Sequence, residues 1–468
     1  MGNQYDLIII GAGPGGLAAA VTAEDLGLKT LVVDEQPEPG GQIYRSMERS
    51  RSENVDVLGK DYFAGKPLVE TFRASSATYI PNTTVINIAN NFDVDLLSGG
   101  ETQRVRGRRV LLSIGATERP VPMKKWTLPG VMGAAAADIL FKSADMVPDE
   151  PVVIAGSGPL LLLAACHLVD NGVEIAAMVE TASFKDYIKA APYLPGALLR
   201  CSYLLKGLQM RWKVKRAGVP LYMGCRDLEV IGGERAEGLR FSYRGRQKDI
   251  DAKTVLLHEG VVPNIRLSES LNCEHEWYEP QRYWKPVLDI WGQTSVKGVS
   301  IAGDSAGIGG GPMATVRGHL AAIDSAYKLQ IISESERDRL AEQHKIYLNK
   351  EKAIRPFLDH IFPPSRQTLV PAGDNIMVCR CEEITSGQIR EAIGQGARHP
   401  TQIKGRTRAG MGPCQGRMCA ATISEIIADS CLIDIVDVGS LRVRTPLKPL
   451  SIEQFANMRF GSNGGDKD

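Results

Sequence analysis

Two glycine-rich turns, each between an apolar strand and a helix, constrain this fold more than any other feature of the sequence. The first turn follows the strand expected over 5–10 and reads Gly11-Ala12-Gly13-Pro14-Gly15-Gly16. A helix is expected from Leu17 to Leu26, and a second strand over 30–33. This order predicts a βαβ unit of the kind that binds a dinucleotide.

The residues of the first turn suit that role individually. Gly11 allows the tight turn, Gly13 lets the backbone approach a pyrophosphate, and Gly16 lets the helix and strand pack closely. Pro14 and Gly15 belong to the turn before the helix, whose free N–H groups would face the phosphates.

An acid is expected at the end of the second strand, where it would bind a ribose hydroxyl. Asp34 lies 18 residues after Gly16, the spacing typical of that acid, and Glu35 is the second candidate. The alternative is a glycine turn in an unrelated α/β fold, which would not account for an acid at this spacing.

The second glycine turn is defective. It reads Gly156-Ser157-Gly158-Pro159-Leu160-Leu161 after a strand over 151–155, and a further strand is expected over 173–179. Leu161 replaces the third glycine, and Val179 stands where the acid belongs, with Glu180 one residue late. We therefore expect this unit not to use NAD(P)H. It would be a structural relic, or would bind another nucleotide or nothing while shaping a partner interface.

The chain's size and charge set outer limits. Its 468 residues suit two to four domains, and a net charge of +1 gives no field that would recruit nucleic acid. The basic clusters over 104–109 and 211–216 are interpreted as solvated faces, with a phosphate or partner-docking patch as the alternative.

Two further features bear on location. The apolar stretch Leu160–Val169 is shorter than the roughly 20 residues of a membrane helix, and no secretory signal is visible. A cytoplasmic protein without a transmembrane segment is therefore expected, with peripheral attachment to the inner membrane as an option.

Four of the nine cysteines form two close pairs near the C-terminus. Cys379 and Cys381 are separated by 32 residues from Cys414 and Cys419, and each pair precedes an expected helix. Four converging thiolates suit zinc or an iron–sulfur cluster. The other five are interpreted as small buried hydrophobic residues rather than catalysts: Cys166, Cys201, Cys225, Cys273 and Cys431.

Three further segments resemble those of flavoproteins with two dinucleotide-binding domains. Gly41 and Gln42 belong to a flavin-contacting stretch, and Gly115 and Ala116 to the turn that leaves the FAD domain. Gly303 and Asp304 form the late motif whose Asp bonds the flavin ribityl chain. Together with the first glycine turn, the resemblance implies bound FAD and a glutathione-reductase-like α/β fold.

The cysteine tail resembles the [2Fe–2S] domain of bacterioferritin-associated ferredoxin, in the C-x4-C form seen in amine-oxidising flavoprotein subunits. Nearly the whole chain resembles the α-type subunits of bacterial dye-linked amino-acid dehydrogenases. That family includes opine (octopine and nopaline) oxidases, hydrogen cyanide synthase and D-hydroxyproline dehydrogenase. The matching segments are 34–45, 115–122, 126–131, 156–163 and the cysteine tail.

The resemblance implies a hetero-oligomer. A β subunit with a D-amino-acid-oxidase-like fold would oxidise an opine, or a related secondary or D-amino acid, at its C–N bond. An FMN would lie between the subunits, and electrons would pass through this chain's cluster and FAD to a quinone or dye. On this view no residue here is a base for the substrate, and the catalytic residues are unknown.

Two alternatives remain at this stage: an NAD(P)H-dependent flavin and iron–sulfur reductase, and a non-catalytic iron–sulfur sensor or scaffold. The expected domains are an FAD-binding domain over 1–122 and 257–330, interrupted by the second dinucleotide fold over 123–256. A helical linker over 331–375, the [2Fe–2S] domain over 376–440 and a tail over 441–468 follow.

Overall fold

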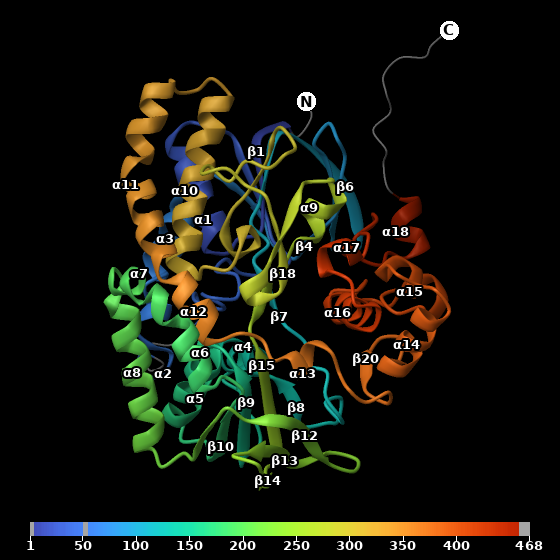
Figure 1. The fold of residues 1–468 in the computed structure, drawn as a ribbon. Coiled ribbons are helices and arrows are strands. Elements are labelled where there is room, and N and C mark those ends of the chain that lie inside the picture. Colours follow the sequence, from blue (N-terminus) through green and yellow to red (C-terminus); the bar gives the residue numbers. More distant parts are fainter. Residues whose placement is uncertain (1–3, 50–54, 458–468) are drawn as a thin grey trace.

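The computed structural model describes residues 4–49 and 55–457. Two mainly parallel sheets form the body of the molecule, one above the other in Figure 1. A small helical domain built from the last part of the chain packs against one side of both.

The first sheet has the order β3-β2-β1-β6-β5-β4, and β19 pairs with the last residues of β6. The pairings among β1, β2, β3, β6 and β19 are parallel, and those among β4, β5 and β6 are antiparallel. The bounds are β1 (Gln4–Ile10), β2 (Thr30–Val33), β3 (Thr78–Ile80), β4 (Thr83–Ile88), β5 (Asp93–Ser98), β6 (Glu101–Leu112) and β19 (Val299–Ile301).

Helices cover this sheet because its strands carry apolar side chains on both faces. In β1, Leu7 to Ile10 are almost completely buried. The helix α1 packs closely on α10, since a Cβ added to Gly318 would clash with the carbonyl oxygen of Gly15. The helices of this domain are α1 (Pro14–Asp25), α2 (Val55–Phe63), α3 (Lys66–Ala74), α9 (Arg266–Ser270) and α10 (Gly311–Lys328).

The second sheet is parallel throughout, in the order β11-β10-β9-β15-β8. Its strands are β8 (Val131–Gly133), β9 (Val152–Ser157), β10 (Ile175–Glu180), β11 (Leu221–Met223) and β15 (Thr254–Glu259). Its helices are α4 (Ala134–Ala144), α5 (Pro159–Asp170), α6 (Phe184–Ala190), α7 (Leu194–Leu198) and α8 (Cys201–Arg216). Between β11 and β15 the chain forms the antiparallel strands β12 (Arg226–Gly232), β13 (Ala236–Tyr243) and β14 (Arg246–Asp251).

Two short strands connect the two sheets. The strand β7 (Ala116–Glu118) leaves the first sheet and pairs antiparallel with β16 (Val261–Pro263), which returns from the second. A hairpin of β17 (His275–Tyr278) and β18 (Tyr283–Pro286) follows.

The segment expected as a helical linker is mostly packed. Its first helix is α11 (Glu334–Ala353), in which Ala341 and Leu348 bury against Met313 and Leu320 of α10. The shorter α12 (Arg355–Ile361) and α13 (Arg366–Leu369) lead to the last domain.

The C-terminal domain has a core of its own, built from Ile389, Ile403 and Ile423 among others. Its elements are β20 (Met377–Cys379), β21 (Ile384–Thr385), α14 (Ser386–Gly394), α15 (Pro400–Thr407), α16 (Ala420–Cys431) and α17 (Ile435–Val438). The irregular tail that follows returns to the first sheet, where the Leu447 N–H donates to the Ile86 carbonyl, before α18 (Ile452–Ala456).

One cysteine prediction was wrong. Cys201 is exposed rather than buried, because it begins α8 on the side that faces away from the body. Cys166, Cys225 and Cys273 are buried as predicted, and Cys431 is partly buried against the C-terminal core.

Candidate functional site

The first glycine turn is as tight as its pattern predicts. Gly11 has a φ of +101°, and a Cβ there would clash with the carbonyl oxygen of Ser113. A Cβ on Gly16 would clash with the carbonyl oxygen of Gly11. At Gly13 a Cβ would come no closer than 3.9 Å to any neighbouring atom. Neighbouring protein atoms therefore leave room for a Cβ at Gly13, the position where a pyrophosphate would approach the start of α1.

The two candidate acids at the end of β2, Asp34 and Glu35, lie in different surroundings. Asp34 is buried, and its Oδ2 accepts the Ala12 N–H at 2.5 Å while its Oδ1 accepts the Gln36 N–H at 2.7 Å. Burial raises the pKa of this carboxyl, against those two hydrogen bonds. Glu35 is exposed and pairs with Lys448 of the tail at 2.5 Å. Asp34 thus braces the glycine turn, and Glu35 is the freer of the two acids to meet a ribose.

The segment with Gly41 and Gln42 lies directly on the first glycine turn. Gly41 has a φ of +61°, and a Cβ there would lie 2.8 Å from the Gly13 Cα. The Gln42 side chain is exposed. The structure therefore brings two predicted flavin-contacting segments together at one place.

The two remaining predicted FAD-binding segments, which contain Gly115 and Gly303, meet beside Gly15. A Cβ on Gly15 would lie 2.9 Å from Ser113 Oγ and 3.0 Å from the Gly303 nitrogen. Gly115 has a φ of +65°, and no described atom lies within 4 Å of where its Cβ would be. Ala116 then begins β7. The backbone of the glycine-rich segments at Gly13, Gly15, Gly41, Gly115 and Gly303 thus surrounds one shared surface, here called the glycine cradle. Such a surface fits a long dinucleotide such as FAD.

Asp304 shapes the turn before α10. Its Oδ1 accepts the N–H groups of Gly309 and Gly310 at 2.8 and 2.9 Å. Arg317, which the sequence analysis did not single out, donates to the carbonyl oxygens of Gly303 and Gly307. These bonds hold the N-terminus of α10 against the glycine cradle.

The four predicted cysteine ligands lie in two contacting pairs. A hydrogen bond from the Cys419 thiol lowers the pKa of Cys379 to about 6, against the effect of burial. Cys381 contacts both the backbone N–H and the thiol of Cys414. No three His, Cys, Asp or Glu side chains in the described ranges are arranged to hold a metal ion as they stand. Two contacting thiol pairs are nevertheless the donor set of a two-iron cluster, with two thiolates for each iron.

Glycines let the two cysteine loops approach each other. A Cβ on Gly412 would clash with the Cys381 Cβ, and a Cβ on Gly410 would lie 3.9 Å from Cys419 Sγ. Burial lowers the pKa of Arg266 on α9, and the weaker charge effects that act on this guanidinium include those of the Cys414 and Cys419 thiols.

In the second dinucleotide fold, side chains occupy the space around the glycine turn and the acid position. Leu161 is fully buried between α5 and its sheet. A Cβ on Gly158 would lie 2.9 Å from the ring of His258, whose Nδ1 is 2.6 Å from Glu118 Oε1. Glu180, at the end of β10, accepts two bonds from Arg211 at 2.6 and 2.7 Å.

A loop also crosses the carboxyl edge of this second sheet, where a nucleotide would bind. The Ser365 N–H donates to Glu259 Oε2 at 2.8 Å, and Thr181 Oγ1 donates to the other oxygen at 3.2 Å. Burial raises the pKa of Glu259 to about 7.

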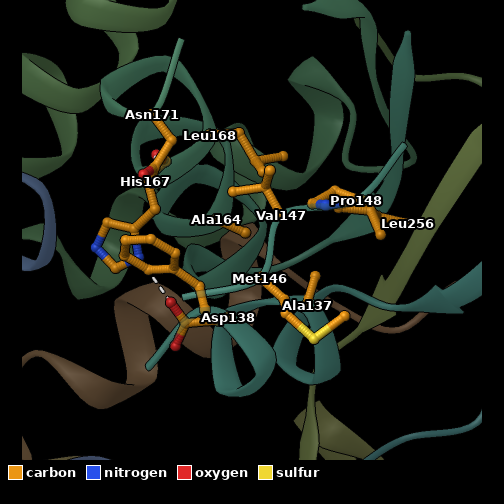
Figure 2. Close-up of a pocket in the computed structure, with 11 residues that line it drawn as sticks. Ala137, Asp138, Met146, Val147, Pro148, Ala164, His167, Leu168, Asn171 and Leu256 are labelled. Atoms are coloured by element: carbon orange, nitrogen blue, oxygen red, sulfur yellow. Dashed lines mark hydrogen bonds and ion pairs between the residues drawn. The ribbon is translucent and has the colours of Figure 1, made fainter. Parts of the chain in front are cut away.

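Neither described cavity coincides with these sites. The cleft between α4 and α5, where His167 bonds Asp138 (Figure 2), holds only about 10 Å³, room for about one water. A second cavity of about 650 Å³ is lined by Glu269, His275, His399 and Arg442, between the FAD-domain residues and the C-terminal domain.

Comparison with family models gives two matches. Residues 5–326 match the pyridine nucleotide-disulphide oxidoreductase family. Residues 377–429 match the BFD-like [2Fe-2S] binding domain. These matches confirm the predicted fold class and the two predicted cofactors, FAD and a [2Fe–2S] cluster.

Full-length relatives are similar across the same span. The chain is 40% identical over 463 residues to the A subunit of opine oxidase from Rhizobium meliloti, covering 97% of this chain and 88% of that one. It is 40% identical to the A subunit of opine oxidase from Agrobacterium tumefaciens (strain Ach5), covering 98% and 92%. Hydrogen cyanide synthase subunit HcnB of Pseudomonas aeruginosa is 31% identical, covering 96% and 98%.

Solved structures share the fold at lower identity. L-proline dehydrogenase from P. horikoshii has a TM-score of 0.68 at 18% identity, covering 96% of this chain and 79% of that one. Lactococcus lactis thioredoxin reductase has a TM-score of 0.51 at 14% identity, covering 70% and 100%. These likenesses describe the fold alone.

Proposed function

The chain belongs to the family of the opine oxidase A subunits and hydrogen cyanide synthase subunit HcnB, and from that premise we propose that it is one subunit of a heteromeric dehydrogenase. The enzyme oxidises the C–N bond of an opine, octopine or nopaline, or of a related secondary or D-amino acid. This subunit carries the electrons onward to a quinone or dye. The observation that carries the proposal is the full-length identity of 40% to an opine oxidase A subunit, in a chain that also has the FAD cradle and both cysteine pairs.

The chain's own residues bind and orient cofactors. The glycine cradle at Gly13 and Gly41 would receive the FAD pyrophosphate, and Glu35 or Asp34 would meet its ribose. Gly115, Ala116 and the Asp304 turn would contact the rest of the cofactor. Cys379, Cys381, Cys414 and Cys419 would hold the cluster. When bound, FAD exchanges electrons in pairs or singly and the cluster carries single electrons.

One segment of the chain supports a link between the two cofactor sites. The Asn264 N–H donates to the Gly115 carbonyl at 3.0 Å, at the predicted flavin turn. Two residues later, the charge of Arg266 interacts with the Cys414 and Cys419 thiols. Electrons would pass between FAD and the cluster near this segment, and we assign no described side chain to proton removal from the substrate.

The second dinucleotide fold serves as a structural unit on this proposal. Buried Leu161, the Glu180–Arg211 pair and the loop at Ser365 support that role, because they lie at the glycine turn, the acid position and the carboxyl edge where a nicotinamide nucleotide would bind.

The partner would be a β subunit with a D-amino-acid-oxidase-like fold and its own FAD, with an FMN between the subunits. The relatives' names support a heteromer, because each describes one subunit of a larger enzyme. Within the described part of the chain, no helix is both long and apolar enough to cross a bilayer. We place the complex in the cytoplasm, with contact to the inner membrane as the route to a quinone.

An anaerobic absorbance titration tests the function. The chain is co-expressed with the product of its neighbouring gene, and the complex receives NADH first, then octopine or nopaline. Bleaching of flavin and cluster by an opine but not by NADH is expected. Bleaching by NADH alone would replace the proposal with the NAD(P)H-dependent reductase, and a preparation without flavin would favour the sensor or scaffold.

A further inference from the structure

Exposed apolar side chains concentrate in one part of the molecule, the helical connection between β10 and β11. Of the 22 large apolar side chains that are exposed in the described residues, nine lie between residues 184 and 212. These helices form the outer edge of the second dinucleotide fold, at the left of Figure 1. The nine are Phe184, Ile188, Tyr193, Leu194, Leu198, Leu199, Leu205, Leu208 and Trp212.

On α8 the apolar residues form a stripe. Leu205, Leu208 and Trp212 are 57%, 65% and 61% exposed, and their spacing places them on one face of the helix. The opposite face packs on α5, where Val214 is fully buried and the Cys166 thiol donates to the Met210 carbonyl. The stripe is therefore a second apolar face that packing within the described chain does not use.

The neighbouring α6 extends the apolar surface. Phe184 and Ile188 are one turn apart and both exposed. The helix lies beside α8, because Tyr187 of α6 accepts a bond from Arg211 of α8 at 3.3 Å. Soluble monomers rarely expose an apolar region of this kind unless something covers it.

The same connection is strongly basic, although the whole chain has a net charge of only +1. Residues 181–217 contain eight Lys and Arg residues and a single acid, Asp186. Five of the eight pair with carboxylates: Lys189, Arg200, Lys206, Arg211 and Lys213. Among the described residues, Lys185, Lys215 and Arg216 have no carboxylate partner. Lys215 and Arg216 lie on either side of the stripe, and Arg216 lies 5.0 Å from the Trp212 ring centroid.

We propose that α6, α7 and α8 dock on the surface of an anionic phospholipid bilayer. A stripe of Leu and Trp flanked by Lys and Arg is the pattern of a helix that lies in the headgroup region, with its cations at the lipid phosphates. A lipid surface offers apolar depth and negative charge together. The inference rests on the proposed function in one respect, because it would place the complex where a membrane quinone is available.

Vesicle flotation with the complex of the full-length chain and its co-expressed partner subunit tests the proposal. Phosphatidylcholine vesicles with phosphatidylglycerol should bind the wild type, phosphatidylcholine vesicles alone should bind it weakly, and added salt should weaken binding. The double variant Lys215→Gln, Arg216→Gln should partition about 30-fold less, the factor implied by about 1 kcal/mol for each interfacial cation. Leu208→Ser with Trp212→Ser should lose binding to both vesicle types.

A matched control separates this face from exposed apolar residues in general. Leu432 is 92% exposed at the end of α16, and Leu432→Ser should bind vesicles as the wild type does. Retained flavin content would show that each variant is folded.

Three results would overturn the proposal. The first is no binding of the wild type to anionic vesicles, and the second is equal binding of all variants. The third is a Leu208→Ser, Trp212→Ser variant that loses its partner subunit while the wild type does not bind vesicles, which would identify a protein interface.

Opine-dependent reduction of a soluble dye, measured on the same preparations, distinguishes failure of the docking proposal from failure of the proposed function. Dye reduction without vesicle binding overturns only the docking, and vesicle binding without dye reduction overturns only the function.

Discussion

The indole N–H of Trp126 donates to the carbonyl oxygen of Met377 at 2.8 Å, so the second dinucleotide fold directly holds the strand that ends at Cys379. The Arg380 guanidinium lies 5.5 Å from the same ring. Trp126 is therefore a residue that positions the cluster loop, although it lies some 250 residues earlier in the chain.

Trp126→Phe should loosen the cluster without affecting FAD. The ring remains for Arg380, but the Met377 carbonyl loses its partner, at a cost of about 1 kcal/mol. We expect cluster iron to pass to a chelator about fivefold faster, with flavin content unchanged. Trp277→Phe is the control, because that indole bonds only exposed Glu279. Equal release rates from both variants would remove Trp126 from this role.

Cys414→Ser should lose cluster iron while it retains FAD. Cys414 contacts Cys381, and serine is a poor ligand in place of a thiolate. Iron analysis and flavin absorbance of the purified protein measure the two cofactors separately. Cys431→Ser, outside both pairs, should keep full iron. Full iron in Cys414→Ser would exclude it from the ligand set.

Asp304→Ala should weaken FAD binding about 10- to 100-fold. The substitution removes the acceptor of two backbone N–H groups, at 2.8 and 2.9 Å, and the expected loss corresponds to about one hydrogen bond to a charged group, about 1.5–3 kcal/mol. Asp289→Ala is matched, because Asp289 also accepts two backbone N–H groups, those of Trp291 and Gln293. If both variants lose flavin equally in a dilution assay, the effect is general destabilisation.

These residues show what the sequence could and could not predict. Gly11 and Gly16 were predicted because close backbone approach within one βαβ unit leaves a local pattern. The four cysteines were found for the same reason, as two short spacings. Arg317 bonds carbonyl groups 14 and 10 residues earlier, in an irregular turn, and Trp126 bonds one across a domain boundary. Such contacts leave no periodicity or motif.

The outward face of α8 was missed for a related reason. In this segment the sequence drew attention only to the basic cluster over 211–216, interpreted as a solvated face with a phosphate or partner-docking patch as the alternative. Only the structure shows that Val214 faces α5 while Leu208 and Trp212 face outward. Asp34 was predicted by spacing, but spacing alone could not show that its carboxylate braces Ala12 and Gln36.

Glu259 should make the protein less stable as pH rises. Burial raises its pKa in the folded state to about 7 from an ordinary value of 4.5. The folded protein then holds a proton that the unfolded chain has lost, so stability is full below about pH 4.5 and falls until pH exceeds about 7. The decline is at most about 3 kcal/mol, at 1.36 kcal/mol for each pKa unit. Melting temperatures of wild type and Glu259→Gln across this range should differ in slope. Parallel curves would mean that Glu259 is ionised throughout.

Arg266 should raise the reduction potential of the cluster, because a nearby positive charge favours the site that gains an electron. Its charge acts on Cys414 and Cys419 from a partly buried position at the start of α9. Arg266→Gln should therefore lower the midpoint potential in a redox titration followed by electron paramagnetic resonance. Arg266→Lys keeps the charge and should stay closer to the wild type. The flavin potential, followed by absorbance in the same titration, should move less, because Arg266 reaches the flavin turn only through the backbone at Asn264. If the cluster potential is equal in the wild type and both variants, solvent and the neighbouring charges screen Arg266. In that case α9 does not tune the cluster through its charge.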